Sequence, residues 1–535
     1  MRLNDQTLHN REPWDKAGIA LPRFDRGAMI QATKAAPQWV HFGAGNIFRA
    51  FPAALAQTLL EQGLLKTGIV VAEGYDGEII DKCFTPFDNL SLLVTLKSDG
   101  SIDKQVIASV ASSFRMDKDL AELKKIFSAP SLQMASFTIT EKGYEFNGRD
   151  GKLLPAIAED FKAGPANPQS YLGRIAALCH ERYIRGALPL ALVSMDNCSH
   201  NGDKLFAAVD AFAKGWIENG VSDAGFADYV RDKSKLSFPW SMIDKITPRP
   251  DEGVRKILAA DGLEDLEGLV TEKNTYVAPF VNAEETQYLV IEDAFPNGRP
   301  ALEKTGVLFT GKETVDKVEK MKVCTCLNPL HTALAVFGCL LGYTRISDEM
   351  KNADLVKLIE GIGYREGLPV VIDPGIIKPK EFIDTVIQVR LPNPFMPDSP
   401  QRIATDTSQK IPIRFGETIK AYREGKAGQS VDSLTLIPLV LAAWLRYLLG
   451  VDDKGASFEV SSDPLYSSLA PMLAGISLGQ KGPFHAALEP ILSNSTIFAV
   501  NLYETGLGKK IESYFEELLA GPGAVAATLR KYIQS

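Results

Sequence analysis

A glycine turn near the N-terminus has the residue types needed to hold a dinucleotide. Residues 39–42 read as a strand, Gly43 and Gly45 follow in a Gly-x-Gly turn, and Asn46 and Ile47 lead into a helix. Glycine permits a tight turn and a close approach of pyrophosphate, and the first N–H groups of a helix attract the anion. We therefore expect Gly43, Gly45, Asn46 and Ile47 to contact the phosphates of a cofactor.

A second strand ends at an acidic residue, as a dinucleotide site requires. Phe48 stands where the usual third glycine would be, so the turn alone is a weak signal. Residues 68–72 read as the next strand, and Glu73 follows at the position where a carboxylate accepts from the adenosine ribose. Residues 74–76 include no basic side chain for a 2′-phosphate. The sequence predicts NAD as the cofactor, in preference to NADP.

Polar residues gather in segments where a plain core would not place them. Two of these segments follow predicted strands, and the carboxyl ends of parallel strands are where open α/β sheets bind ligands. The segments are residues 138–144, 194–202, 238–248 and 321–331. We expect Thr140, Glu141 and Asn197 to contact the cofactor, and Asp196 to contact the substrate.

The first half of the chain alternates strand-like and helix-like segments, which is the pattern of a parallel α/β sheet. Helices are predicted over residues 48–62, with Pro52 in the first turn after a lengthened loop, and over residues 117–127. Residues 274–293 read as extended and indicate antiparallel strands that close the domain. The strand candidates are residues 39–42, 68–72, 105–109, 135–140 and 188–194.

The second half carries helical apolar spacing with few strand signals. We expect an N-terminal Rossmann-type domain with added β-strands over residues 1–304, and a mainly helical domain over residues 305–535. The helical segments are residues 313–345, 347–363, 429–450, 463–475, 484–493 and 508–533.

Composition narrows the class of protein. The 535 residues carry a net charge of -8, which argues against an electrostatic grip on nucleic acid or on anionic lipid. The N-terminus has no signal-peptide pattern, and the richest apolar run, residues 434–449, is interrupted by Pro438 and Arg446. A cytoplasmic enzyme is expected. Cys324 and Cys326 form a Cys-x-Cys pair with no second pair nearby, so no metal site is predicted.

Together these segments resemble the polyol-specific long-chain dehydrogenases, the mannitol dehydrogenase family. The resemblance runs from about Trp39 to at least Arg414 and is much more specific than any one motif. It covers the Gly-x-Gly turn with Arg49-Ala50, the Thr-Glu-x-Gly-Tyr run at 140–144, Asp196-Asn197 with Asn201-Gly202, the Asp-x-Ile-Thr-Pro run at 244–248, Ile291-Glu292-Asp293, the string from Lys322 to His331, and the residues Asn393-Pro394, Asp398, Arg402-Ile403, Asp406, Ser408, Lys410 and Arg414.

The resemblance implies a reaction without a metal. Lys322 would take the hydroxyl proton of an alcohol while hydride leaves for the nicotinamide, and burial would help because it disfavours the charged lysine. Asn197 and Asn328 would donate to the developing alkoxide, and His331 would donate to the same oxygen or orient the substrate. Five residues separate Lys322 from Asn328, one more than in the family's string. A bulge would absorb the extra residue; otherwise the base shifts, and Lys320 is the second candidate.

Within the family, basic residues favour a sugar acid as the small-molecule substrate. A carboxylate rewards a fixed cation, whereas a polyol needs only hydrogen bonds. The leading hypothesis is therefore the interconversion of a ketohexuronate and an aldonate, of the fructuronate/mannonate kind. The residues expected to meet the carboxylate are Lys378, Arg390, Arg402, Lys410 and Arg414.

Other functions stay open at this point. Inside the family they are a mannitol 2-dehydrogenase, another polyol dehydrogenase and a tagaturonate reductase. A β-hydroxyacid dehydrogenase also joins a Rossmann domain to a helical one, and a binding protein would have kept NAD and lost catalysis. Residues 390–414 are either a carboxylate-binding wall or a proline-punctuated connector. The sequence leaves open the exact substrate, the direction of reaction and the oligomeric state.

Overall fold

Six parallel strands carry the glycine turn in the computed structural model, which describes residues 1–148 and 150–534. Their order in the sheet is β6-β3-β2-β7-β8-β9, so that the first strand along the chain lies in the middle and the order reverses beside it. This is the Rossmann arrangement, in which ligands bind where the order reverses. The strands are β2 (Trp39–Phe42), β3 (Ile69–Glu73), β6 (Val110–Arg115), β7 (Met134–Phe137), β8 (Leu190–Ser194) and β9 (Leu236–Ser237).

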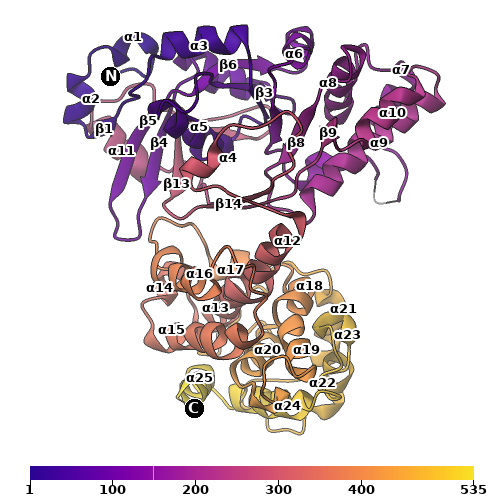
Figure 1. Cartoon of the computed structure of the whole chain (residues 1–535). Helices are drawn as coiled ribbons and strands as arrows, with labels where there is room; N and C mark the ends of the chain where they lie inside the picture. The colour runs from indigo at the N-terminus through magenta and orange to yellow at the C-terminus, as the bar shows by residue number, and fades with distance from the viewer. Residues whose placement is uncertain (149, 535) are drawn as a thin grey trace. The chain divides into compact units, whose positions relative to one another are not determined.

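The residues of β2, β3, β7 and β8 are all buried and mostly apolar, because both faces of the sheet are covered. Trp39 and Val71 face one core, which they share with helix α5 (Pro52–Glu61). Val40 and Phe42 face the other core, against the helices on the opposite side of the sheet (Figure 1). These helices are α6 (Leu120–Phe127), α8 (Tyr171–Ile184) and α9 (Asn201–Glu218).

Two smaller sheets and a short ribbon are added to this unit. The first sheet has the order β1-β5-β4-β13, the second has the order β10-β14-β15, and β11 pairs with β12. Their strands are β1 (Ile19–Ala20), β4 (Ser91–Leu96), β5 (Ile102–Ile107), β10 (Ser241–Asp244), β11 (Leu269–Val270), β12 (Tyr276–Val277), β13 (Phe280–Glu284), β14 (Tyr288–Glu292) and β15 (Leu308–Thr310).

Two predictions about these strands were wrong in detail. Residues 105–109 were expected in the parallel sheet, but β5 pairs antiparallel with β4, and β6 takes the expected place. The cause is a tight succession of β5 and β6, which leaves no helix between them. Residues 274–293 do form strands, but β13 pairs parallel with β4 while β14 pairs antiparallel with β10, so neighbours in sequence join different sheets.

The helix after the glycine turn also differs from the prediction. Helix α4 (Asn46–Ala50) begins directly after Gly45, without the lengthened loop. The helix is interrupted at Phe51, and Pro52 is the first residue of α5. A first helical residue has no intrahelical partner for its N–H, so proline is tolerated there. The other helices of this part are α1 (Asp5–Leu8), α2 (Glu12–Lys16), α3 (Arg26–Ala35), α7 (Pro155–Ala163), α10 (Ala224–Arg231) and α11 (Glu252–Ala260).

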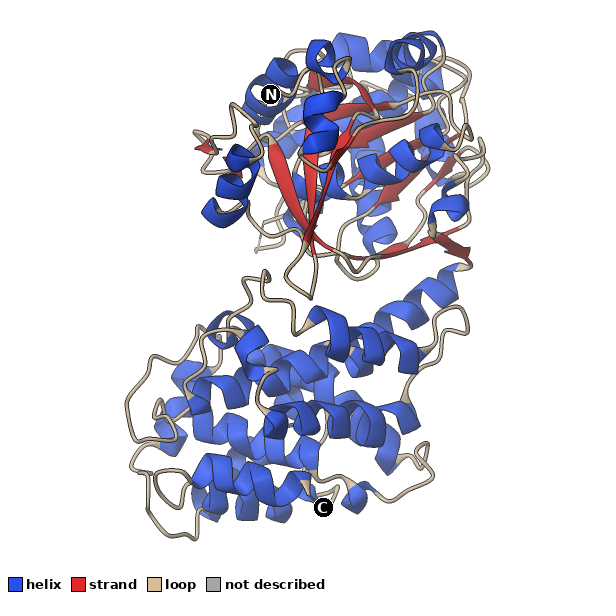
Figure 2. Ribbon diagram, turned by 90° about the vertical axis from the view of Figure 1, so that its left-hand side faces the viewer, coloured by secondary structure: helices blue, strands red, loops and turns tan. Residues whose placement is uncertain are grey.

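The chain divides into two units. The α/β unit comprises residues 1–97 and 101–316, and the helical unit comprises residues 98–100 and 317 onward. The division falls inside α12 (Lys312–Met321), beyond the predicted boundary after residue 304. The sheets lie in the first unit, and the second is built from helices (Figure 2). The predicted fold class, an α/β Rossmann-type domain followed by a mainly α-helical domain, is confirmed.

The helical unit is built around two apolar helices, α13 (Asn328–Leu341) and α20 (Leu436–Tyr447). The continuous helix from Lys312 to Leu341 is long and apolar enough to cross a membrane, but 78% of its apolar window is buried in the protein, as in a core helix. The other helices are α14 (Ile346–Glu349), α15 (Ala353–Glu360), α16 (Pro379–Thr385), α17 (Pro400–Ile403), α18 (Thr407–Ile411), α19 (Glu417–Arg423), α21 (Tyr466–Leu469), α22 (His485–Leu492), α23 (Ser495–Phe498), α24 (Leu507–Leu518) and α25 (Ala524–Ile533).

A buried acid in this unit leads to a prediction about stability. Among the described residues, neither carboxyl oxygen of Glu349 has a hydrogen-bond partner, and burial raises the pKa of Glu349 from 4.5 to about 9. The folded protein therefore keeps a proton that the unfolded chain releases, so the free energy of unfolding should fall as pH rises from about 4.5 to 9. We expect Glu349→Gln to raise the melting temperature by several degrees at pH 8 and by much less at pH 5. Equal shifts at both pH values, measured by thermal unfolding, would contradict this assignment.

Candidate active site

The glycine turn after β2 is closed on one side and open on the other. Gly43 has a φ of 103°, and a Cβ there would lie 2.2 Å from the carbonyl oxygen of Thr138, so only glycine fits. At Gly45 a Cβ would meet nothing within 4 Å. A cofactor phosphate therefore has room to approach the backbone at Gly45, beside Asn46 and Ile47 at the start of α4.

A buried polar network around His41, on the strand that precedes the glycine turn, supports this turn. The two ring nitrogens of His41 lie 2.6 Å from the hydroxyl of Ser136 and 2.8 Å from that of Thr138. Burial lowers the pKa of His41 to about 3, so the ring is neutral. His41 also stacks on Phe48, with ring centroids 4.3 Å apart. These contacts assign His41 to support of the turn, since both of its nitrogens are already engaged.

The carboxylate of Glu73 joins the glycine turn to the loop after β3. One oxygen accepts from the backbone N–H of Ala44 at 2.8 Å, and the other accepts from Tyr75 at 2.8 Å and Asp76 at 3.1 Å. Glu73 is thus a buried positioning group as well as the predicted partner of a ribose. A carboxylate accepts about four hydrogen bonds, so one position is left for a ribose hydroxyl.

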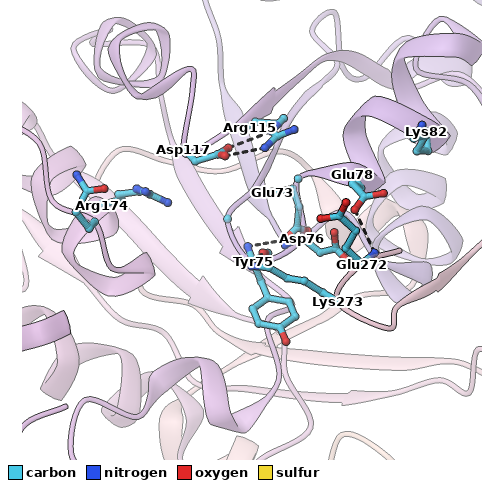
Figure 3. Close-up of a pocket in the computed structure, with 13 residues that line it drawn as sticks. Glu73, Tyr75, Asp76, Glu78, Lys82, Arg115, Asp117, Arg174, Glu272 and Lys273 are labelled. Atoms are coloured by element: carbon cyan, nitrogen blue, oxygen red, sulfur yellow. Dashed lines mark hydrogen bonds and ion pairs between the residues drawn. The ribbon is translucent and has the colours of Figure 1, made fainter. Parts of the chain in front are cut away.

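A cavity of about 660 Å³ opens beyond Glu73, of a size that suits the adenosine half of a dinucleotide. Its lining contradicts the expectation that nothing basic lies there. Arg115, Lys82 and Arg174 all line it (Figure 3). Arg115 is 42 residues away in sequence, but β6 pairs with β3 so that Arg115 lies opposite Glu73. Strand pairing, which the local sequence does not reveal, brings this cation to the site.

Arg49 is a further candidate for contacting the cofactor, which the sequence indicated only as part of the family motif. Its guanidinium is buried, and it donates to the carbonyl of Ala278 at 2.7 Å and to the side chain of Asn46 at 2.9 Å. Within the described chain, no acidic side chain forms an ion pair with it. A buried cation beside the glycine turn would suit a pyrophosphate. An arginine in a short helix with three apolar residues, four positions after Gly45, was the available signal.

Loops at the ends of β7 and β8 are joined through Asp196. Its carboxylate accepts from the backbone N–H groups of Ile139 at 3.0 Å and Thr140 at 2.8 Å, and from the hydroxyl of Tyr144 at 2.6 Å. Thr140 has a φ of 63°, a conformation that these bonds help to hold. Asp196 was predicted to contact the substrate. Its carboxylate instead accepts hydrogen bonds from the backbone of the loop that carries Thr140 and Glu141, and so stabilises that loop.

The other predicted residues of these loops reach the surface. Asn197 follows Asp196 and is exposed. The carboxylate of Glu141 is exposed and forms an ion pair with Lys204 on α9. The structure thus places Thr140 and Asn197 at the carboxyl edge of the sheet, whereas the charge of Glu141 is directed to a neighbouring lysine.

A π-helical turn resolves the spacing between Lys322 and Asn328. The turn η5 (Lys322–Cys326) closes with a 3.1 Å hydrogen bond from the N–H of Leu327 to the carbonyl of Lys322. A π turn accommodates one residue more than an α turn, which is the predicted bulge, and such turns are frequent at functional sites. Lys322 is buried and Lys320 is exposed. These observations favour Lys322 over Lys320 as the base.

Helix α13 brings two more predicted residues together. Asn328 is its first residue, and His331 follows one turn later. Burial, followed by the charges of Arg414, Arg390, Arg402 and Lys410, lowers the pKa of His331 to about 3. His331 is therefore neutral and is able to donate or accept one hydrogen bond. Its Nε2 lies 3.5 Å from Asp398 and, among the described residues, has no hydrogen-bond partner.

The predicted carboxylate-binding cations divide into two sets. Arg390, Arg402, Lys410 and Arg414 all act electrostatically on His331, and they lie in or beside the helical turns α17, α18, η8 (Val386–Arg390) and η9 (Pro412–Gly416). The segment is therefore partly helical and is not extended throughout. Lys378 is exposed, forms an ion pair with Glu381 at 2.8 Å, and is not among the charges acting on His331.

Within the first set the cations are held differently. The guanidinium of Arg402 pairs with Asp398, and the ammonium of Lys410 donates to the carbonyls of Ile403 and Thr405. Arg414 donates to the hydroxyl of Thr332 at 2.6 Å and, in the part of the chain that the structure describes, forms no ion pair.

The described residues contain no group of three or more histidine, cysteine, aspartate or glutamate side chains that could hold a metal ion. Cys324 and Cys326 both lie in the π turn, where Cys326 is buried. Burial of Cys326 raises its thiol pKa and disfavours the thiolate that a metal would bind.

Comparisons with known proteins agree with this architecture. Residues 37–304 match the mannitol dehydrogenase Rossmann domain, and residues 314–519 match the mannitol dehydrogenase C-terminal domain. The chain is 52% identical to a D-mannonate oxidoreductase of Thermotoga maritima, over 100% of this chain and 99% of that protein.

Two solved structures are also similar. A substrate-free D-sorbitol dehydrogenase has a TM-score of 0.80 at 26% identity, covering 96% of this chain and 98% of that one. The Pseudomonas fluorescens mannitol 2-dehydrogenase, solved as a ternary complex with NAD and D-mannitol, has a TM-score of 0.70 at 26% identity and covers 100% of both chains. The chain belongs to the mannitol dehydrogenase family.

Proposed function

We propose that this protein is an NAD-dependent D-mannonate oxidoreductase, which interconverts D-fructuronate and D-mannonate. The name of the relative that is 52% identical over its full length supports this substrate pair. NAD is the cofactor of the proposed reaction, in line with the complex of the related mannitol 2-dehydrogenase. We expect such an enzyme to work on metabolites of the cytoplasm.

The observation that carries the substrate class is the state of Arg414. Its guanidinium lies near the neutral His331, donates one hydrogen bond to Thr332, and has no carboxylate partner among the described residues. Burial lowers the pKa of Arg414 to about 10, so it is still a cation at neutral pH. A partly buried cation that lacks an anion favours an anionic ligand. The carboxylate of a sugar acid supplies that anion, whereas a polyol does not.

The proposed division of labour rests on the family resemblance and on the burial of Lys322. Bound NAD would accept the hydride in mannonate oxidation. Lys322, buried at the π turn, would take the hydroxyl proton of the substrate, because the oxidation needs a base at that oxygen. Asn328 and His331 on α13 would donate to the oxygen as its negative charge develops, and the family resemblance proposes the same role for Asn197.

The cofactor residues fit a dinucleotide on three observations. The turn is open at Gly45, Glu73 keeps one acceptor position for a ribose, and the buried cation of Arg49 lies beside the turn. Glu73 also fixes the backbone of both loops that would border the ribose. A mutation of Glu73 would therefore disturb the positions of these loops as well as the contact to the cofactor.

A panel of keto substrates tests the proposal. NADH oxidation is measured with fructuronate, tagaturonate, fructose and xylulose. We expect kcat/KM to be highest with fructuronate. Preference for tagaturonate would indicate a tagaturonate reductase, whose substrate is an epimer of fructuronate. Preference for fructose would indicate a mannitol 2-dehydrogenase. Absence of turnover with all four would refute the proposal that the protein is an oxidoreductase for sugar acids or polyols.

Removal of metals should leave the activity intact. Proton transfer is assigned to Lys322, and the described residues offer no cluster of metal-binding side chains. After prolonged dialysis against a strong chelator, we expect kcat to be within about twofold of the untreated enzyme. Loss of activity that zinc or manganese restores would overturn the lysine mechanism.

A further inference from the structure

Arg115, in the cavity beyond Glu73, is held by two carboxylates. Its Nη2 lies 2.7 Å from Oδ2 of Asp117, and its Nε lies 3.1 Å from Oδ1 of the same carboxylate (Figure 3). Its Nη1 donates to Asp81. All three nitrogens of the guanidinium are therefore occupied. These ion pairs raise the pKa of Arg115 and lower that of Asp117, so both groups are charged across the working pH range.

The position of Arg115 relative to the cofactor loop is specific. Arg115 is the register partner of Glu73 on the neighbouring strand. A Cβ on Gly77 would lie 2.4 Å from Nε of Arg115, so the guanidinium lies directly on the loop that follows Glu73. The same cavity is lined by Glu73, Arg115, Asp117 and Gly77. A group attached to the ribose next to Glu73 would face this arginine and its carboxylates.

The charge balance decides what such a group experiences. The cavity lining has one more acid than base, and Asp81 adds a further negative charge at Arg115, so a 2′-phosphate would meet a net negative lining although arginines are present. The acids are Glu73, Asp76, Glu78, Asp117 and Glu272, and the bases are Lys82, Arg115, Arg174 and Lys273. With the two carboxylates neutralised, the same arginine would offer a fork of donors that matches a phosphate.

We propose that Asp81 and Asp117 determine the selectivity for NAD over NADP by binding the guanidinium of Arg115 and denying it to a 2′-phosphate. This assignment rests on the proposed function, since it concerns the cofactor of that reaction. Asp81 and Asp117 act through Arg115 and are positioning residues.

The test is the ratio of the dissociation constants of NADPH and NADH, measured by fluorescence titration. The wild type should bind NADH more tightly. Asp81→Asn with Asp117→Asn keeps the shape of both side chains and should lower the NADPH/NADH ratio about tenfold or more, the effect of one charge-assisted hydrogen bond or two. Adding Arg115→Gln to this double variant should restore the ratio. Arg115→Gln alone leaves two free carboxylates and should raise the ratio.

A matched control is present in the same unit. Arg299 is held by Asp293 and Glu303 with a similar exposure of all three side chains, and it does not line the cavity. Asp293→Asn with Glu303→Gln should leave the ratio unchanged. The proposal is overturned if the wild type binds both cofactors equally, if the Asp81/Asp117 variant keeps the wild-type ratio, or if its ratio falls equally without Arg115. Failure of the wild type to bind NADH at all would instead refute the proposed function.

Discussion

Lys322→Ala is expected to lower kcat for mannonate oxidation by about 10²–10⁴-fold, the usual contribution of a general acid–base group. The loss should fall on turnover, because the glycine turn and Glu73 belong to the other unit and are untouched. The dissociation constant for NADH, from fluorescence titration, should stay within about twofold of wild type. A small primary amine added to the assay should restore part of the rate by occupying the vacated space.

Lys320→Ala is the matched control for this prediction. Lys320 is two residues away and exposed, whereas Lys322 is buried in the π turn. We expect the Lys320 variant to keep near wild-type activity. If Lys320→Ala loses the activity and Lys322→Ala keeps it, the base is misassigned, and the role of the π turn in setting the spacing to Asn328 falls with it.

Arg414→Met is expected to lower kcat/KM for fructuronate by about 30- to 1000-fold and to change kcat/KM for fructose little. Truncating one partner of a desolvated, hydrogen-bonded charge pair costs about 2–4 kcal/mol, and every 1.4 kcal/mol is about tenfold. Methionine keeps much of the volume and removes the charge. Because Arg414 has no carboxylate partner in the described protein, the free enzyme loses no ion pair, and its melting temperature should be unchanged or higher.

Lys378→Met provides the control within the set of predicted cations. Lys378 is exposed and pairs with Glu381. Its replacement should therefore leave kcat/KM for fructuronate and for fructose within about twofold of wild type. Equal losses with fructuronate and fructose on changing Arg414 would assign Arg414 to the structure of the site. An equal loss with fructuronate on changing Lys378 would remove the special role of Arg414.

Local pattern was sufficient for the parts of the fold that local chemistry governs. The apolar runs that become β2, β3, β7 and β8 are buried on both faces, and this burial is what their composition predicts. The Gly-x-Gly turn and the acidic residue after β3 were likewise readable, since Gly43 has a backbone conformation that only glycine adopts freely. The family resemblance placed Lys322, Asn328 and His331 in order before their surroundings were known.

Other features depended on which distant segments pair, and no local pattern records that. The sequence placed residues 105–109 in the parallel sheet because it could not distinguish β5 from β6. It found no cation near Glu73, because Arg115 reaches the site only through the pairing of β6 with β3. It also treated the predicted cations alike, although burial and partners separate the paired, exposed Lys378 from Arg414, which lacks a carboxylate partner.

The sequence by itself determined the fold class, the family and the residue types that its chemistry requires. The tertiary structure decided the electrostatic state of those residues. His331 is neutral because it is buried among cations, and the pairing of Arg115 is completed by Asp81, which lies 34 residues away in the sequence. Helical and strand periodicity are local, whereas desolvation and ion pairing depend on every group that packs nearby, so the charge of a site residue emerges only when the chain is folded.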